Sequence, residues 1–177
     1  MVPYKLIISQ DDWLSHEKLG PIYRKYSDCF NENRQKDWEY NVLILALLYE
    51  MTLGTASFWY PYLRILPKHA NKLLPCFWGS EVLEELQDRD LKARLEEMKI
   101  DLVLAWKRME RVLVENTHLF PKVFHNRELF FTLHCLVSSR CYPRGLIPVA
   151  DMLNHTECVS SYEFVNTTMH NEGHHDT

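Results

Sequence analysis

The sequence predicts an α+β fold that is mainly α-helical, with two to four short strands. Apolar residues recur at helical spacing in two long segments of the second half of the chain. Extended segments rich in apolar and β-branched residues are brief, and they lie outside those helical segments. Helices are therefore expected to form most of the core.

The first part of the chain predicts one strand, one loop and one buried helix. Residues 4–8 follow a proline and are predicted as a strand, and the charge-mixed residues 28–37 are predicted as a solvated loop. Residues 38–51 are apolar on nearly every side, which predicts a buried helix. Gly54 stands just after this helix, where a left-handed C-cap residue is needed.

Residues 57–67 predict a turn-rich packed segment, because Pro61 and Pro67 each disfavour helical geometry in the residue before them. The aromatic side chains of this segment are expected to be core anchors rather than ligand contacts.

Two further helices are predicted in the second half. Residues 80–115 are expected to be helical, with Ser80 as the N-cap and a break at Asp88 and Asp90. Their inner face is expected to comprise Leu91, Leu95, Met98, Leu102, Trp106, Met109 and Leu113. Residues 128–139 form the second helix, which Asn126 can cap.

After Arg140 the helical spacing stops. Residues 145–151 are predicted as a short extended segment that leads to a tight corner at Asn154 and His155. Residues 162–165 are predicted as a last strand, and the polar residues 166–177 as a frayed tail.

Composition limits the classes of protein that this chain can represent. It has 177 residues, 46% of them hydrophobic, and a net charge of -4, which excludes a mainly disordered chain and disfavours a nucleic-acid surface. The longest apolar run, residues 42–49, is far shorter than the roughly 20 residues of a membrane span. With no visible secretory signal and five cysteines without close pairs, we expect reduced thiols in an intracellular, cytoplasmic or nuclear protein. We also expect it to be monomeric, with no membrane or nucleic-acid partner.

Most standard motifs are absent, including the glycine-rich nucleotide loops, the GxSxG elbow and the HExxH zinc motif. His170, His174 and His175 have some metal-ligand spacing, but they lie in the predicted tail, so no metal site is expected.

One polar block remains after this survey, from the helix end at Arg140 to the corner Asp151-x-x-Asn154-His155. An arginine at a helix C-terminus suits the helix dipole, or it can pair with a ligand carboxylate. The corner offers an amide, an imidazole and backbone groups that can bind a purine edge. Alternatively, Asp151 and Asn154 only satisfy their own turn through side-chain to backbone hydrogen bonds.

Five colinear segments together resemble the SET-domain protein methyltransferases of the Rubisco large-subunit type, which carry a helical insert in the SET fold. The first is Val2-Pro3-Tyr4-Lys5-Leu6, and the second joins residues 45–50 to the S-x-W-x-P-Y-L-x-x-L-P pattern in residues 57–67. The others are residues 75–78 with 84–86, Ser139-Arg140-Cys141-Tyr142, and Leu146-Ile147-Pro148 with Asp151-Met152-Leu153-Asn154-His155.

This resemblance implies methyl transfer from S-adenosylmethionine to a side-chain nitrogen of a protein substrate, usually a lysine; relatives that methylate histidine share the same motifs. It implies that Asn154 and His155 hold the adenine and ribose of the cofactor and that Arg140 approaches its methionine part. Asp151 would brace the corner, and Tyr142 would line the substrate channel. The catalytic residue is not identified.

The family also has a glycine-rich cofactor segment before its first strand here and a Tyr-Gly segment after the Asn-His corner. Neither occurs in this chain, in which 22 residues follow His155. We therefore expect residues 1–177 to be a partial SET domain, with a helical insert at about 38–140, a cofactor corner at about 141–165 and a flexible tail at 166–177. Such a fragment is expected to bind the cofactor weakly or not at all. The alternative is a non-catalytic helical interaction module derived from such an enzyme.

Overall fold

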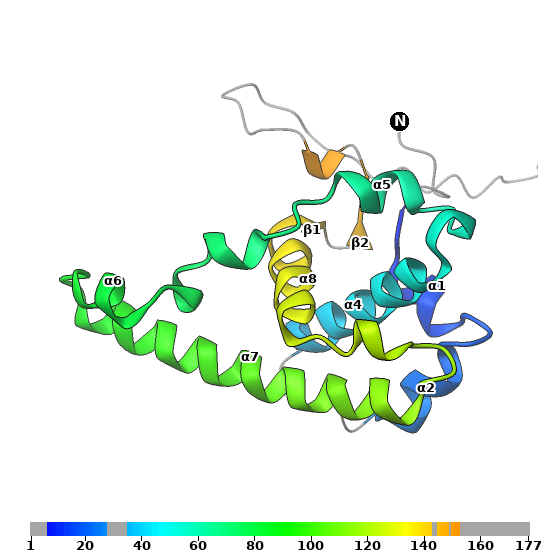
Figure 1. Cartoon of the computed structure of the whole chain (residues 1–177), viewed down its shortest axis with the longest axis horizontal. Helices are drawn as coiled ribbons and strands as arrows, with labels where there is room; N and C mark the ends of the chain where they lie inside the picture. Colours follow the sequence, from blue (N-terminus) through cyan, green and yellow to red (C-terminus); the bar gives the residue numbers. More distant parts are fainter. Residues whose placement is uncertain (1–6, 28–34, 143–144, 149, 153–177) are drawn as a thin grey trace, which may run out of the picture.

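The computed structural model describes residues 7–27, 35–142, 145–148 and 150–152, and helices dominate them (Figure 1). The α-helices are α1 (Gln10–Leu14), α2 (Gly20–Lys25), α4 (Gln35–Leu53), α5 (Tyr60–Ile65), α6 (Ser80–Glu84), α7 (Arg89–Glu115) and α8 (Arg127–Arg140). Single 3₁₀ turns are η2 (Gly54–Ala56), η3 (Ala70–Leu73), η4 (Pro75–Phe77), η5 (Lys122–Phe124) and η6 (Ala150–Met152). Strands β1 (Cys141–Tyr142) and β2 (Gly145–Leu146) form one antiparallel pair. The mainly α prediction is confirmed.

Helices α4 and α8 pack together at the centre of the molecule. Residues 41–50 of α4 and residues 130–137 of α8 are all buried, so both helices lack a solvent-facing side over these turns. Helix α4 begins at Gln35, so the prediction that residues 35–37 belong to a loop is wrong. Gly54 has φ of 54°, which confirms the left-handed conformation expected after this helix.

Helix α7 lies along one side of this centre, and its Trp106 ring centroid is 5.6 Å from that of Phe130 on α8. Its inner face is buried at Leu95 and from Leu102 onward, whereas Leu91 and Met98 are 41% and 37% exposed. The difference arises because the first turns of α7 and the short α6 project beyond the central helices (Figure 1).

The predicted break before this helix is confirmed, since the Asp88 carboxylate caps α7 by accepting a hydrogen bond from the Leu91 N–H at 2.9 Å. The prediction of Ser80 as an N-cap is wrong, because Gly79 occupies that position and Ser80 is the first residue of α6. Asn126 caps α8 as predicted, accepting from the N–H groups of Glu128 and Leu129.

Helix α5 replaces the turn-rich segment that the two prolines predicted. Pro61 lies in its first turn, where a helix has no N–H partner to lose and tolerates proline. The aromatic residues here do not all anchor the core: Tyr62 is 6% exposed, but Phe58 is 66% exposed.

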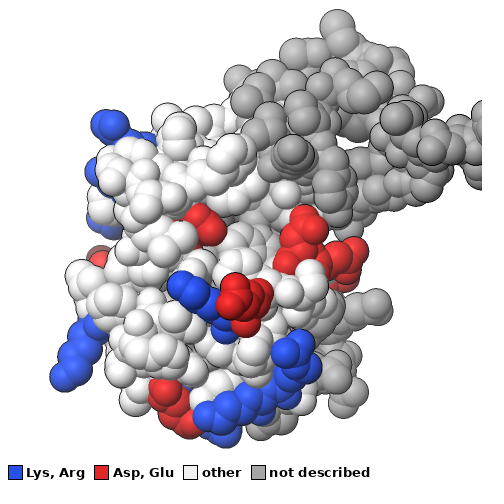
Figure 2. All heavy atoms as spheres, turned by 90° about the vertical axis from the view of Figure 1, so that its right-hand side faces the viewer, with Lys and Arg blue, Asp and Glu red and all other residues white. Residues whose placement is uncertain are grey.

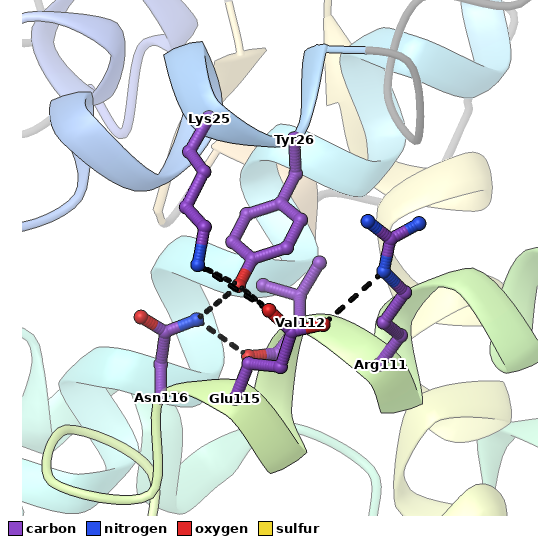
Figure 3. A network of polar contacts seen from close by, with 6 residues as sticks. All are labelled: Lys25, Tyr26, Arg111, Val112, Glu115 and Asn116. Atoms are coloured by element: carbon purple, nitrogen blue, oxygen red, sulfur yellow. Dashed lines mark hydrogen bonds and ion pairs between the residues drawn. The ribbon is translucent and has the colours of Figure 1, made fainter.

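A polar network joins the end of α2 to the end of α7 (Figure 3). The buried Tyr26 hydroxyl donates to Glu115 Oε2 at 2.7 Å. The Glu115 carboxylate also accepts from Lys25 Nζ at 3.3 Å and from Arg111 Nε at 3.2 Å. These contacts lower the pKa of Glu115, the Tyr26 hydrogen bond having the largest effect.

The surface carries charges of both signs. On the face shown in Figure 2, Lys and Arg side chains lie close to Asp and Glu side chains. None of the helices in the described ranges combines the length and apolarity that a membrane crossing requires.

Candidate functional site

The polar block singled out in the sequence lies where α8 ends and the chain turns back through β1 and β2. In this hairpin Cys141 pairs with Leu146 and Tyr142 pairs with Gly145. Ile8 adds an antiparallel bridge, with Ile8 N donating to Leu146 O at 2.9 Å and Leu146 N donating to Ile8 O at 3.1 Å. Of the strand predicted at residues 4–8, Ile7 and Ile8 are described, and Ile8 pairs as a strand residue would.

Gly145 permits this close approach of the chain's beginning. Its φ is 122°, and a Cβ atom built on it would lie 2.1 Å from the Ile8 carbonyl oxygen. A side chain at this position would therefore collide with backbone. The glycine brings the N-terminal segment directly against the start of the candidate site.

The side chain of Arg140, the last residue of α8, contacts Asp151 and is mostly shielded from solvent. Its Nη1 donates to the Asp151 carbonyl oxygen at 2.9 Å and lies 3.9 Å from Asp151 Oδ2. The Arg140 side chain is 24% exposed and the Asp151 side chain 0%. The buried carboxylate thus has a guanidinium partner, which a buried charge requires.

Tyr62 of α5 is the second partner of this carboxylate: its hydroxyl donates to Asp151 Oδ2. Burial raises the pKa of Tyr62 above its ordinary value, and the hydrogen bond to Asp151 raises it further. The hydroxyl therefore keeps its proton and acts as a donor. Asp151 Oδ1, in contrast, is buried without a hydrogen-bond partner among the described residues.

Tyr142 of β1 contacts Ala150, the residue before Asp151. Its hydroxyl donates to the Ala150 carbonyl oxygen at 3.2 Å, and Tyr142 packs against the small apolar cluster of Ile7, Ile147 and Ala150. The role of Tyr142 in a substrate channel stays a prediction.

The structure thus brings together three of the five predicted site residues, Arg140, Tyr142 and Asp151. Asn154 and His155 lie outside the described residues, as do the predicted strand at 162–165 and the tail. The alternative in which Asp151 only satisfies its own turn does not account for its carboxylate, which is bound by Tyr62 and Arg140.

Sequence reasoning missed Tyr62. It is separated from Asp151 by 89 positions, and its aromatic character alone predicts only a core anchor. No local pattern links the two residues. The one available signal is that both lie inside the motifs that carry the family resemblance.

The donors of Arg140 allow a test of whether the site fits the methionine part of S-adenosylmethionine. Arginine has five N–H donors, and both contacts to Asp151 use Nη1. Nε and Nη2 make no hydrogen bond or ion pair with the part of the chain that the structure describes, so they can pair with a ligand carboxylate. In the same part of the chain, no group of three or more His, Cys, Asp or Glu side chains is arranged to hold a metal ion.

Comparison with known proteins identifies the fold. No family model matches the chain, and no curated protein does. Among solved structures, the SET domain of LSMT bound to lysine and AdoHcy is similar, with a TM-score of 0.70, 24% identity and coverage of 88% of this chain. The same domain bound to MeLysine and AdoHcy gives 0.68, 24% and 91%.

The chain spans about a third of the length of these solved chains, 34% and 35% respectively. The resemblance inferred from the sequence motifs is therefore confirmed at the level of the fold: over most of its length, the chain has the fold of part of the chain solved as the SET domain of LSMT.

Proposed function

We propose that this chain forms the Asn154–His155 wall of a cofactor site in a SAM-dependent protein methyltransferase, with a protein lysine side chain as the acceptor. The observation that carries the proposal is the match of 88% of the chain to a SET domain that was solved with lysine and AdoHcy. The lysine and methyl-lysine of the two solved complexes favour lysine over histidine as the acceptor.

The chain's own residues would bind and orient in this reaction. Arg140 would direct its remaining N–H donors at the ligand carboxylate, while Asp151 holds the guanidinium in place through its carbonyl oxygen and carboxylate. Asn154 and His155 would hold the nucleoside end through amide, imidazole and backbone groups. S-adenosylmethionine, when bound, supplies an electrophilic methyl group on a sulfonium, and the lysine amine must reach it neutral and in line.

Titration of the isotope-labelled chain with AdoHcy, followed by NMR, tests this proposal because it detects binding even in the millimolar range. We expect the perturbed backbone signals to cluster between the end of α8 and His155. Asn154→Ala should remove the response, whereas the same change at Asn166 should leave it intact.

A scattered response, or none at the highest soluble AdoHcy concentration, would contradict the proposal and favour the helical interaction module. A response that survives Asn154→Ala would refute the assignment of that residue.

A further inference from the structure

The contact between α5 and η6 connects the helical part of the chain to the candidate cofactor corner. Tyr62 reaches Asp151 across 89 positions of sequence. In the sequence, Asp151 belongs to the same D-x-x-N-H corner as Asn154, which follows three residues later.

The stability of the fold does not by itself explain the surroundings of the Asp151 carboxylate. Its side chain is 0% exposed, Arg140 Nη1 is 3.9 Å from Oδ2, and Oδ1 is buried without a hydrogen-bond partner among the described residues. A buried ion pair is often no more stabilising than well-packed apolar residues of similar volume. An arrangement of this kind calls for a functional explanation.

We propose that Tyr62 is a positioning residue, whose hydroxyl fixes the Asp151 carboxylate and, through the Arg140 guanidinium that Asp151 binds, sets the affinity of the Arg140–Asp151 corner for the cofactor. This inference rests on the proposed function. Arg140 holds the Asp151 carbonyl oxygen at 2.9 Å, and Tyr62 holds the side chain, so backbone and carboxylate are anchored separately.

The geometry distinguishes Tyr62 from its neighbour Tyr60 on the same helix. Tyr62 is 6% exposed and donates to the carboxylate. The Tyr60 ring is half-buried and lies against the Arg64 guanidinium, whose Cζ is 5.8 Å from the ring centroid. Tyr60→Phe is therefore a matched control that removes one hydroxyl from α5 without touching Asp151.

The test compares AdoHcy dissociation constants and thermal midpoints for the whole chain and its Tyr62→Phe and Tyr60→Phe variants. We expect Tyr62→Phe to weaken AdoHcy binding by roughly tenfold, the equivalent of one hydrogen bond to a charged group. Its effect should be smaller in an Asp151→Asn background, because a neutral acceptor makes a weaker hydrogen bond. Tyr60→Phe should leave the affinity near that of the unmodified chain.

Equal affinities for the two tyrosine variants would overturn the inference, and so would effects of Tyr62→Phe and Asp151→Asn that simply multiply. A loss of thermal stability with unchanged affinity would show a purely structural role, which also overturns it.

If the unmodified chain does not respond to AdoHcy, the proposed function fails. The effect of Tyr62 on the position of Asp151 is then tested by NMR of the ligand-free protein. The backbone signals of Asp151 and Met152 should then shift in Tyr62→Phe and not in Tyr60→Phe. Unshifted signals would overturn the positioning itself.

Discussion

At the scale of single residues, Tyr26 shows how one buried hydroxyl can connect two distant helices. Its ring lies between two cations, with Lys25 Nζ 4.7 Å and Arg111 Cζ 5.6 Å from the ring centroid. The Tyr26 hydroxyl donates to the Glu115 carboxylate (Figure 3). Next to this contact, Asn116 Nδ2 donates to the Val112 carbonyl oxygen. The carboxylate of Glu115 is thus the shared acceptor of the network.

Replacement of Glu115 by Gln should flatten the acid side of the stability profile. The folded pKa of Glu115 lies below the unfolded value, so its contribution is present above the unfolded pKa of about 4.3 and is lost as the pH falls through the folded pKa. We expect the free energy of unfolding of the unmodified chain, measured by urea denaturation, to fall more steeply below about pH 4.5 than that of Glu115→Gln.

Glu110→Gln, an exposed position on the same helix, is the control and should keep the steep profile. Parallel profiles for Glu115→Gln and the unmodified chain would mean that the network does not bind protons differently in the folded state.

At the scale of elements, three glycines separate backbone strain from steric collision. Gly145 combines φ of 122° with a virtual Cβ 2.1 Å from the Ile8 carbonyl oxygen, Gly54 has φ of 54° with open space around it, and Gly79 has open space and no positive φ. Gly54 compared with Gly79 therefore gives the cost of a positive φ, and Gly145 compared with Gly54 gives the added cost of the collision with the Ile8 backbone.

Alanine at these positions should destabilise the fold in the order Gly145, Gly54, Gly79. We expect about 3 kcal/mol at Gly145, about 1 kcal/mol at Gly54 and little change at Gly79. Urea unfolding measures the free energies, and loss of the Ile8 and Leu146 backbone signals in Gly145→Ala would locate the damage. Similar values for Gly145→Ala and Gly79→Ala would show that the bridge does not constrain the fold.

The elements also show what the sequence can and cannot predict. Helical spacing predicted α7 and α8, and Asn126 predicted where α8 begins, because these signals lie within a few residues of the structure that they specify. Helix α5 was missed because Pro61 disfavours a helix before it but suits the first turn of a helix that starts there. The Tyr62–Asp151 contact was missed because it depends on how α5 and η6 meet in space, which no local pattern encodes.

At the scale of the whole molecule, stability depends on the contacts of the central helices. Phe130 is 1% exposed, and its ring lies against Trp106 of α7 as well as Phe131 and His134 of α8. Its neighbours along α8 are buried without interruption to Val137. The chain is therefore expected to unfold as one unit when this centre is weakened.

Phe130→Ala should destabilise the chain by about 3–5 kcal/mol, the usual cost of truncating a buried phenylalanine. Phe58→Ala removes the same ring at a position that is 66% exposed and should cost less than about 1 kcal/mol. Urea unfolding followed by circular dichroism and by tryptophan fluorescence should give coincident transitions for both variants. Separate transitions for Phe130→Ala would mean that α7 and α8 belong to different folding units.

The cysteines of the central region give this packing a chemical consequence. Cys76 of η4 and Cys135 of α8 are free thiols that are 1% and 3% exposed, and burial raises the pKa of Cys135 to about 12. Burial also raises the pKa of Cys76. Alkylating reagents attack accessible thiolates. In the folded protein these two thiols are protonated and buried, so they are protected from such reagents. These two thiols can therefore be alkylated only when the packing around them opens. The rate of their alkylation then reports how often the centre of the molecule opens.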